Sequence, residues 1–66
     1  MDSVSKAAPI LTLQLGYAEA QAYARHLRRI RLVDYEQHAQ DADEASDMLE
    51  AGDKILRQLE RAGFRA

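Results

Sequence analysis

The apolar positions change their spacing along the chain, and the change marks the predicted elements. From Pro9 the apolar residues alternate with others, which places Leu11, Leu13 and Leu15 on one side. A period of two is typical of a half-buried strand. A lone strand leaves its backbone N–H and C=O groups unpaired, and the chain offers no second strand. The sequence therefore predicts a short N-terminal strand whose partner, if the strand exists at all, belongs to another copy or another protein.

A helical period begins after Gly16. Apolar side chains recur at spacings of three and four from Ala20 to Ile30 and form one stripe. Other positions of this segment, including the arginines, fall elsewhere around the helix. The pattern predicts a helix over residues 17–31.

The second helical pattern covers residues 35–62 and allows two interpretations. The apolar phase runs through without a Gly or Pro near its start, which favours a single helix. Aspartate followed three residues later by Gln or Glu resembles a helix start, which favours a pair, 35–39 and 42–62. The pair is the preferred interpretation, with a break near Gln40 and Asp41.

The last helix carries a heptad-like seam of small and apolar residues. Gly52 lies on this seam, either as a tolerated small residue or as a point of close approach by another backbone. The predicted fold is mainly α, a short strand followed by a helical hairpin. It forms one small helical domain over residues 9–66 after a disordered tail of residues 1–8. The seam consists of Ala45, Met48, Gly52, Ile55, Leu59 and Ala62.

Length and composition indicate the class of protein. The 66 residues include no cysteine, which excludes disulfides and thiolate metal sites. No apolar run approaches the roughly 20 residues of a membrane-spanning helix, and we expect a cytoplasmic protein without membrane contact. A core this small scarcely offsets the entropy of ordering, which favours self-association or docking on a partner. We expect a homodimer, with contacts from Leu11, Leu13, Met48, Gly52, Ile55 and Leu59.

Little in the sequence supports catalysis. His26 and His38 are the candidates for proton transfer near neutral pH. Asp34 and Asp41 lie at helical spacing from His38, but they fit equally well as helix caps, and metal sites use three or four ligands. The three glycines are scattered and make no phosphate-binding loop. We expect a non-enzyme with no metal and no cofactor.

Charge is divided between the two halves of the chain. Residues 1–33 carry a net charge of +3 and residues 34–66 of −5. The acidic run is interpreted as a solvated helix start or as a face for a basic protein surface. The basic segment is interpreted as a phosphate-binding face or as a face that the following acids neutralise. The acidic candidates are Asp41, Asp43, Glu44, Asp47 and Glu50, and the basic candidates are Arg25, Arg28, Arg29 and Arg31.

The start of the chain resembles the ribbon-helix-helix repressors. The resemblance is carried by Leu-x-Leu-x-Leu at residues 11–15, followed by Glu19 and Ala20. It implies that a strand from each of two chains pairs into an antiparallel ribbon whose outward residues read DNA. The residues it would place against DNA are Ile10, Thr12 and Gln14.

The pattern over residues 10–64 resembles a small family of uncharacterised proteobacterial strand-helix-helix proteins associated with mobile elements. Genes of that setting often encode regulators or inhibitors of host defence, including small CRISPR inhibitors. We predict a non-enzymatic regulatory or inhibitory protein that binds an unidentified protein. A dimeric DNA-binding regulator of the ribbon-helix-helix type is the alternative. The resemblance is carried by Asp34-Tyr35, Asp43-Glu44-Ala45, Lys54-Ile55 and Ala62-Gly63-Phe64 after the leucines.

Overall fold

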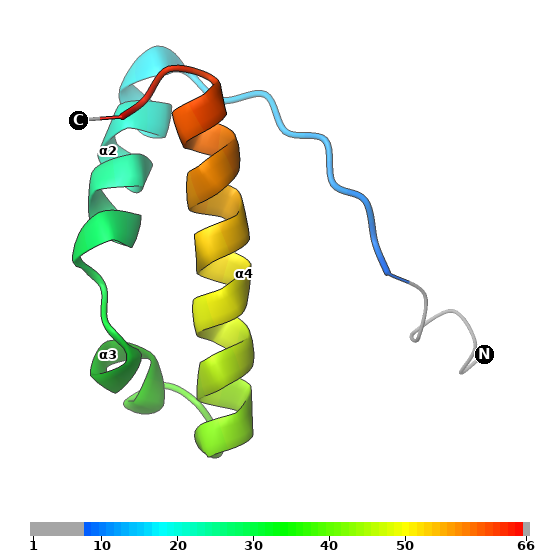
Figure 1. The fold of residues 1–66 in the computed structure, drawn as a ribbon, viewed down its shortest axis with the longest axis vertical. Coiled ribbons are helices and arrows are strands. Elements are labelled where there is room, and N and C mark those ends of the chain that lie inside the picture. Colours follow the sequence, from blue (N-terminus) through cyan, green and yellow to red (C-terminus); the bar gives the residue numbers. More distant parts are fainter. Residues whose placement is uncertain (1–7, 66) are drawn as a thin grey trace.

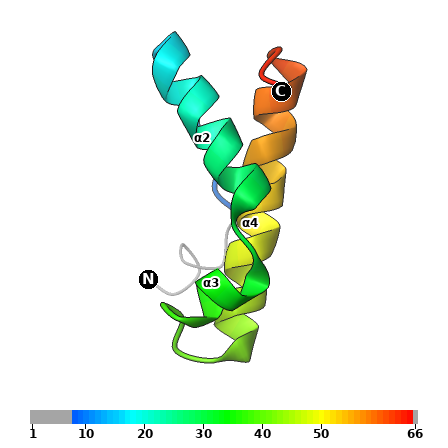
Figure 2. The ribbon, with the colours of Figure 1, turned by 90° about the vertical axis from the view of Figure 1, so that its left-hand side faces the viewer.

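The computed structural model describes residues 8–65, which form three helices joined by short connections (Figure 1). Helix α2 spans Tyr17–Arg29, α3 spans Leu32–Glu36 and α4 spans Ala42–Arg61. α2 and α3 follow one another along one side of α4, and α4 returns antiparallel to α2 (Figures 1 and 2). The helices therefore make a single layer rather than two packed layers.

The predicted N-terminal strand is wrong. Residues 8–16 are irregular, and no strand occurs anywhere in residues 8–65. Leu11 and Leu13 are 75% and 68% exposed, whereas one face of a half-buried strand would be covered. Without a partner strand the backbone groups of this segment bond to water, so nothing holds it in a sheet. The predicted disordered tail, residues 1–8, lies outside the described residues except for Ala8.

Carboxylate side chains mark the starts of the first two helices. Glu19 Oε1 accepts a hydrogen bond from the backbone N–H of Gly16 at 2.8 Å. Asp34 Oδ2 accepts one from the N–H of Arg31 at 2.8 Å. Both satisfy an N–H group that the first turn leaves unpaired. Because Arg31 is the extended N-cap of α3, α2 ends at Arg29, two residues earlier than the sequence predicts.

The second helical region is a pair, as the preferred interpretation has it. Asp41 is the N-cap of α4, and its Oδ1 accepts a hydrogen bond from the N–H of Glu44 at 2.8 Å. Glu44 Oε1 accepts one from the N–H of Gln40 at 2.7 Å. The predicted break near Gln40 and Asp41 is confirmed. The first member of the pair lies earlier than the predicted range 35–39, because Asp34 is its third residue rather than its cap.

A left-handed glycine ends α4. Gly63 has φ +108°, and the N–H of Phe64 donates to the carbonyl of Leu59 at 3.0 Å. The N–H of Gly63 donates to the carbonyl of Glu60, also at 3.0 Å. These two bonds define the Schellman motif, which pairs carbonyl groups that the last turn of α4 leaves free. The reversed chain places the ring of Phe64 5.2 Å from that of Tyr17, which joins the two ends of the hairpin.

The core is small and consists of alanine, glycine and leucine. Its largest side chains, Leu27 and Leu59, are each still 8% exposed. None of the large side chains in residues 8–65 is fully buried. A single layer of helices offers one internal seam, so apolar residues on its open face stay in water. The buried residues are Ala20, Ala24, Leu27, Ala45, Gly52 and Leu59, with Leu56 and Phe64 packed beside them.

Candidate functional site

A groove that is open to solvent lies where the three helices meet. We call it the open groove. It encloses about 500 Å³. Apolar residues of α2 and α4 form its two long walls, and α3 closes one end. Its lining consists of Tyr23, His26, Leu27, Ile30, Asp34, Tyr35, His38, Met48, Ala51, Gly52 and Ile55.

Gly52 lies against side chains of α2 and α3. A Cβ added to it would lie 2.6 Å from Tyr35 Oη and 3.4 Å from Leu27 Cδ2. The three atoms nearest to that Cβ belong to the side chains of Tyr35 and Leu27, so side chains of the same chain approach this glycine, rather than another backbone as the sequence suggested. Gly52 and Leu59 are buried within the chain, so Met48 and Ile55 are the members of the predicted dimer contact on α4 that stay open to the groove.

Aromatic residues give the groove its character. Burial raises the pKa of the Tyr35 hydroxyl, and the nearby Tyr23 and Asp53 add to the rise. The Tyr23 ring lies 5.3 Å from the imidazole of His26. Tyr23 is 47% exposed and Ile55 is 39% exposed. The groove therefore presents large apolar surface that the hairpin itself leaves uncovered.

The five predicted acidic residues divide into two groups. Asp41 and Glu44 bond to backbone N–H groups and hold the start of α4. Asp43, Asp47 and Glu50 are exposed and follow one another at spacings of four and three, which places them on one face of the helix. None of the three forms an ion pair with another of the described residues. We call Asp43, Asp47 and Glu50 the acidic row.

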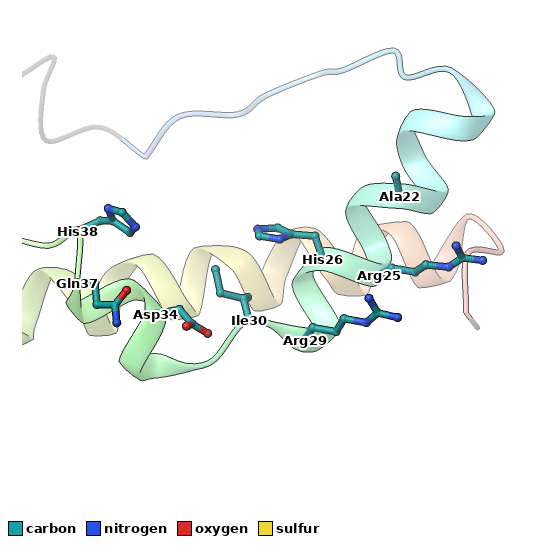
Figure 3. A pocket seen from close by; sticks show the side chains of 8 residues that line it. All are labelled: Ala22, Arg25, His26, Arg29, Ile30, Asp34, Gln37 and His38. Carbon is teal, nitrogen blue, oxygen red and sulfur yellow. The ribbon is translucent and has the colours of Figure 1, made fainter.

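The predicted arginines also separate. Arg28 pairs with Glu60 at 3.4 Å and donates a hydrogen bond to the carbonyl of Phe64, so it ties α2 to the end of α4. Arg25 and Arg29 instead line a second hollow of about 620 Å³ beside α2 and α3. Figure 3 shows their side chains extending the same way. The structure therefore reduces the basic candidates for ligand contact, because Arg28 is engaged within the fold.

Both histidines line the second hollow, where they do not form a metal site. His26 comes from α2 and His38 from the segment after α3, and both lie away from the two arginines (Figure 3). Asp34 also lines the hollow, but its carboxylate accepts the backbone hydrogen bond from Arg31. Nowhere in residues 8–65 do three His, Asp or Glu side chains gather as metal ligands. The hollow offers an open, partly basic surface.

Comparison with models of protein families identifies the family of this chain. The model of DUF7706, a family of unknown function, matches residues 1–66. The chain belongs to the DUF7706 family. No curated protein and no solved structure matches it. Among the described residues of this DUF7706 chain, no helix is both long and apolar enough to cross a membrane.

Three groove residues of the DUF7706 chain differ from what the sequence indicates. Tyr23 and Ile30 belong to the apolar stripe of the first helix, and the stripe predicts burial. In the structure they line the open groove, because α4 covers only part of the stripe. The sequence did not predict that the Tyr35 hydroxyl lies against Gly52. A glycine on an apolar helical seam signals a close neighbour, but the spacing does not say which residue that neighbour is.

Proposed function

We propose that this protein is a non-enzymatic regulatory or inhibitory protein that binds another protein through the acidic row. The observation that carries the proposal is the exposure of Asp43, Asp47 and Glu50 on one face of α4 without an ion-pair partner among residues 8–65. A basic surface on the partner would supply the missing countercharges. Complementary charge of this kind speeds association and selects one orientation.

The helix that carries the acidic row is well suited to present it. α4 is 20 residues long and is capped at both ends, by Asp41 and by the turn at Gly63. From Asp43 to Glu50 the row advances seven residue steps, about 10 Å along the helix axis. Acidic side chains near a helix N-terminus also interact favourably with the helix dipole. The carboxylates therefore sit on a firm scaffold at little cost to its stability.

A binding role is also supported by the shape of the two hollows. Both are open, so polar groups in them remain in contact with water. Catalysis generally uses polar groups held in a dry, enclosed setting.

We propose further that the protein acts in the cytoplasm, since it uses no disulfide to stabilise its small core.

The test removes charge from the acidic row without changing its shape. Asp43→Asn combined with Glu50→Gln is compared with Glu36→Gln combined with Asp53→Asn, which removes two exposed carboxylates elsewhere. Tagged protein is used to capture partners from its source cells, and the captured proteins are quantified by mass spectrometry. We expect a partner that the wild type and the control retain and that binds the row variant roughly tenfold more weakly.

Equal capture by all three proteins would contradict the proposal. A gel shift with DNA at low salt, where phosphate contacts are strongest, separates it from the DNA-binding alternative. We expect no shift. If a shift occurs and the combination of Arg25→Gln and Arg29→Gln abolishes it, the function belongs instead to the second hollow.

A further inference from the structure

We infer that the open groove is the contact surface for a second copy of this chain, and that two hairpins pack across it antiparallel to each other. This inference concerns a different partner from the one that the acidic row would bind, and Asp47 is the one residue that the two proposals share. It rests on the spacing of the groove residues, on the exposure of Tyr23 and Ile55 and on the distribution of charge along α4.

The groove residues of α2 are spaced symmetrically. They occupy positions i, i+3, i+4 and i+7, a set that reads the same in both directions along a helix. Two such rows match when their helices run antiparallel, because the first residue of each meets the last residue of the other. The row consists of Tyr23, His26, Leu27 and Ile30.

The groove residues of α4 repeat the same spacing. The row consists of Met48, Ala51, Gly52 and Ile55. The centres of the two rows lie at the same level, because Leu27 Cδ2 is 3.4 Å from the place where a Gly52 Cβ would be. One two-fold axis through both centres therefore matches both rows at once. It places Tyr23 against Ile30 of the second copy and Met48 against Ile55 of the second copy.

A second copy would cover the surface that the hairpin leaves open. Tyr23 and Ile55, at opposite walls of the groove, are 47% and 39% exposed. Stable helical domains pack two layers of helices around one core, and this chain forms one layer. Two hairpins stacked across the groove make a four-helix arrangement with a shared core.

The charges along α4 favour a second copy that runs antiparallel to the first. Asp47 precedes Ala51 by four residues, Lys54 follows it by three, and both are exposed. Residues at these spacings border Ala51 on the helix surface. An antiparallel copy places Asp47 beside Lys54 of the other chain at two equivalent positions. A parallel copy would place the acidic halves of the two α4 helices together, which is unfavourable.

The first test blocks the axis and measures the molecular mass by sedimentation equilibrium. Ala51→Arg adds a long charged side chain at an exposed position on the axis. Ala22→Arg adds the same side chain at an exposed position of α2 outside the open groove. We expect twice 7.4 kDa for the wild type and for Ala22→Arg, and 7.4 kDa for Ala51→Arg. Circular dichroism confirms that each variant keeps its helices.

Two outcomes of this test would overturn the inference. A monomeric wild type would leave the groove to the exposed segment 8–16 or to a different protein. A dimer that survives Ala51→Arg would lie on another face.

The second test reverses the charges. Asp47→Lys alone brings two lysines together at each border and is expected to weaken the dimer at low salt. Asp47→Lys combined with Lys54→Asp restores opposite charges and is expected to recover most of the loss. Within one helix these residues are seven positions apart, about 10 Å, which is too far for a direct pair. A double variant that dissociates as readily as the single variant contradicts the antiparallel contact.

Discussion

The contact between Gly52 and Tyr35 decides the sign of a substitution that helix propensity alone would predict incorrectly. Alanine is favoured over glycine inside a helix by about 1 kcal/mol. A methyl group at Gly52 would lie 2.6 Å from Tyr35 Oη, so the phenol must move out of its place between the helices. Overpacking of this kind costs roughly 1–3 kcal/mol. We expect Gly52→Ala to lower the free energy of unfolding by about 1 kcal/mol in urea titrations.

The matched control for Gly52→Ala is the same change made together with Tyr35→Phe. Removing the hydroxyl leaves the nearest ring carbon at 3.7 Å, an ordinary van der Waals distance. In that background Gly52→Ala is expected to be neutral or stabilising, which a double-mutant cycle measures. Equal effects of Gly52→Ala in both backgrounds would show that the hydroxyl does not restrict this position.

Tyr35 also predicts a dependence of stability on pH. Burial raises the pKa of its hydroxyl above the ordinary value of about 10, so the folded chain holds the proton more firmly than the unfolded chain. The corresponding stability is fully present below pH 10 and is lost as the pH rises through the folded-state pKa. Thermal melts should show a decline in Tm above about pH 10 that is smaller for Tyr35→Phe. Identical declines would contradict the assignment.

At the scale of elements, the helices follow from local signals and the strand does not. The cap at Asp41 and the turn at Gly63 each depend on only a few neighbouring residues, and the structure has both. The alternation of Leu11 and Leu13 gives only the period of a strand. Whether a strand forms depends on a partner far along the chain or outside it, and no local pattern contains that information. Residues 8–16 are irregular for this reason.

The candidate site, like the fold, was predictable from the sequence only where local patterns determine it. The apolar seam of α4 is visible in the sequence, but it is wider than the surface that α2 and α3 cover. Which side of the seam is buried depends on how those helices pack, so Gly52 and Leu59 are buried while Met48 and Ile55 stay partly exposed in the open groove. The division of the acidic residues between caps and the acidic row likewise appears only once α4 has a fixed start.

At the scale of the whole molecule, the hairpin has one covered seam and two surfaces that point outward. The open groove is apolar and symmetric in its spacing, which suits a second copy. The acidic row is charged and carries no ion pair within residues 8–65, which suits a basic partner. A dimer across the groove would present Asp43 and Glu50 of the acidic row twice, while Asp47 borders the other chain. Two linked sites bind a partner with repeated basic surfaces more tightly than either site alone.

The antiparallel dimer is the central claim, and nuclear Overhauser effects between two differently labelled copies test it most directly. Met48 and Ile55 are about 10 Å apart along one helix, and so are Tyr23 and Ile30, so strong cross-peaks within either pair must arise between chains. In a mixed sample, isotope filtering records only contacts between labelled and unlabelled copies. We predict cross-peaks from Met48 to Ile55 and from Tyr23 to Ile30. Their absence in a sample of dimeric mass, or a monomeric mass, would contradict the claim.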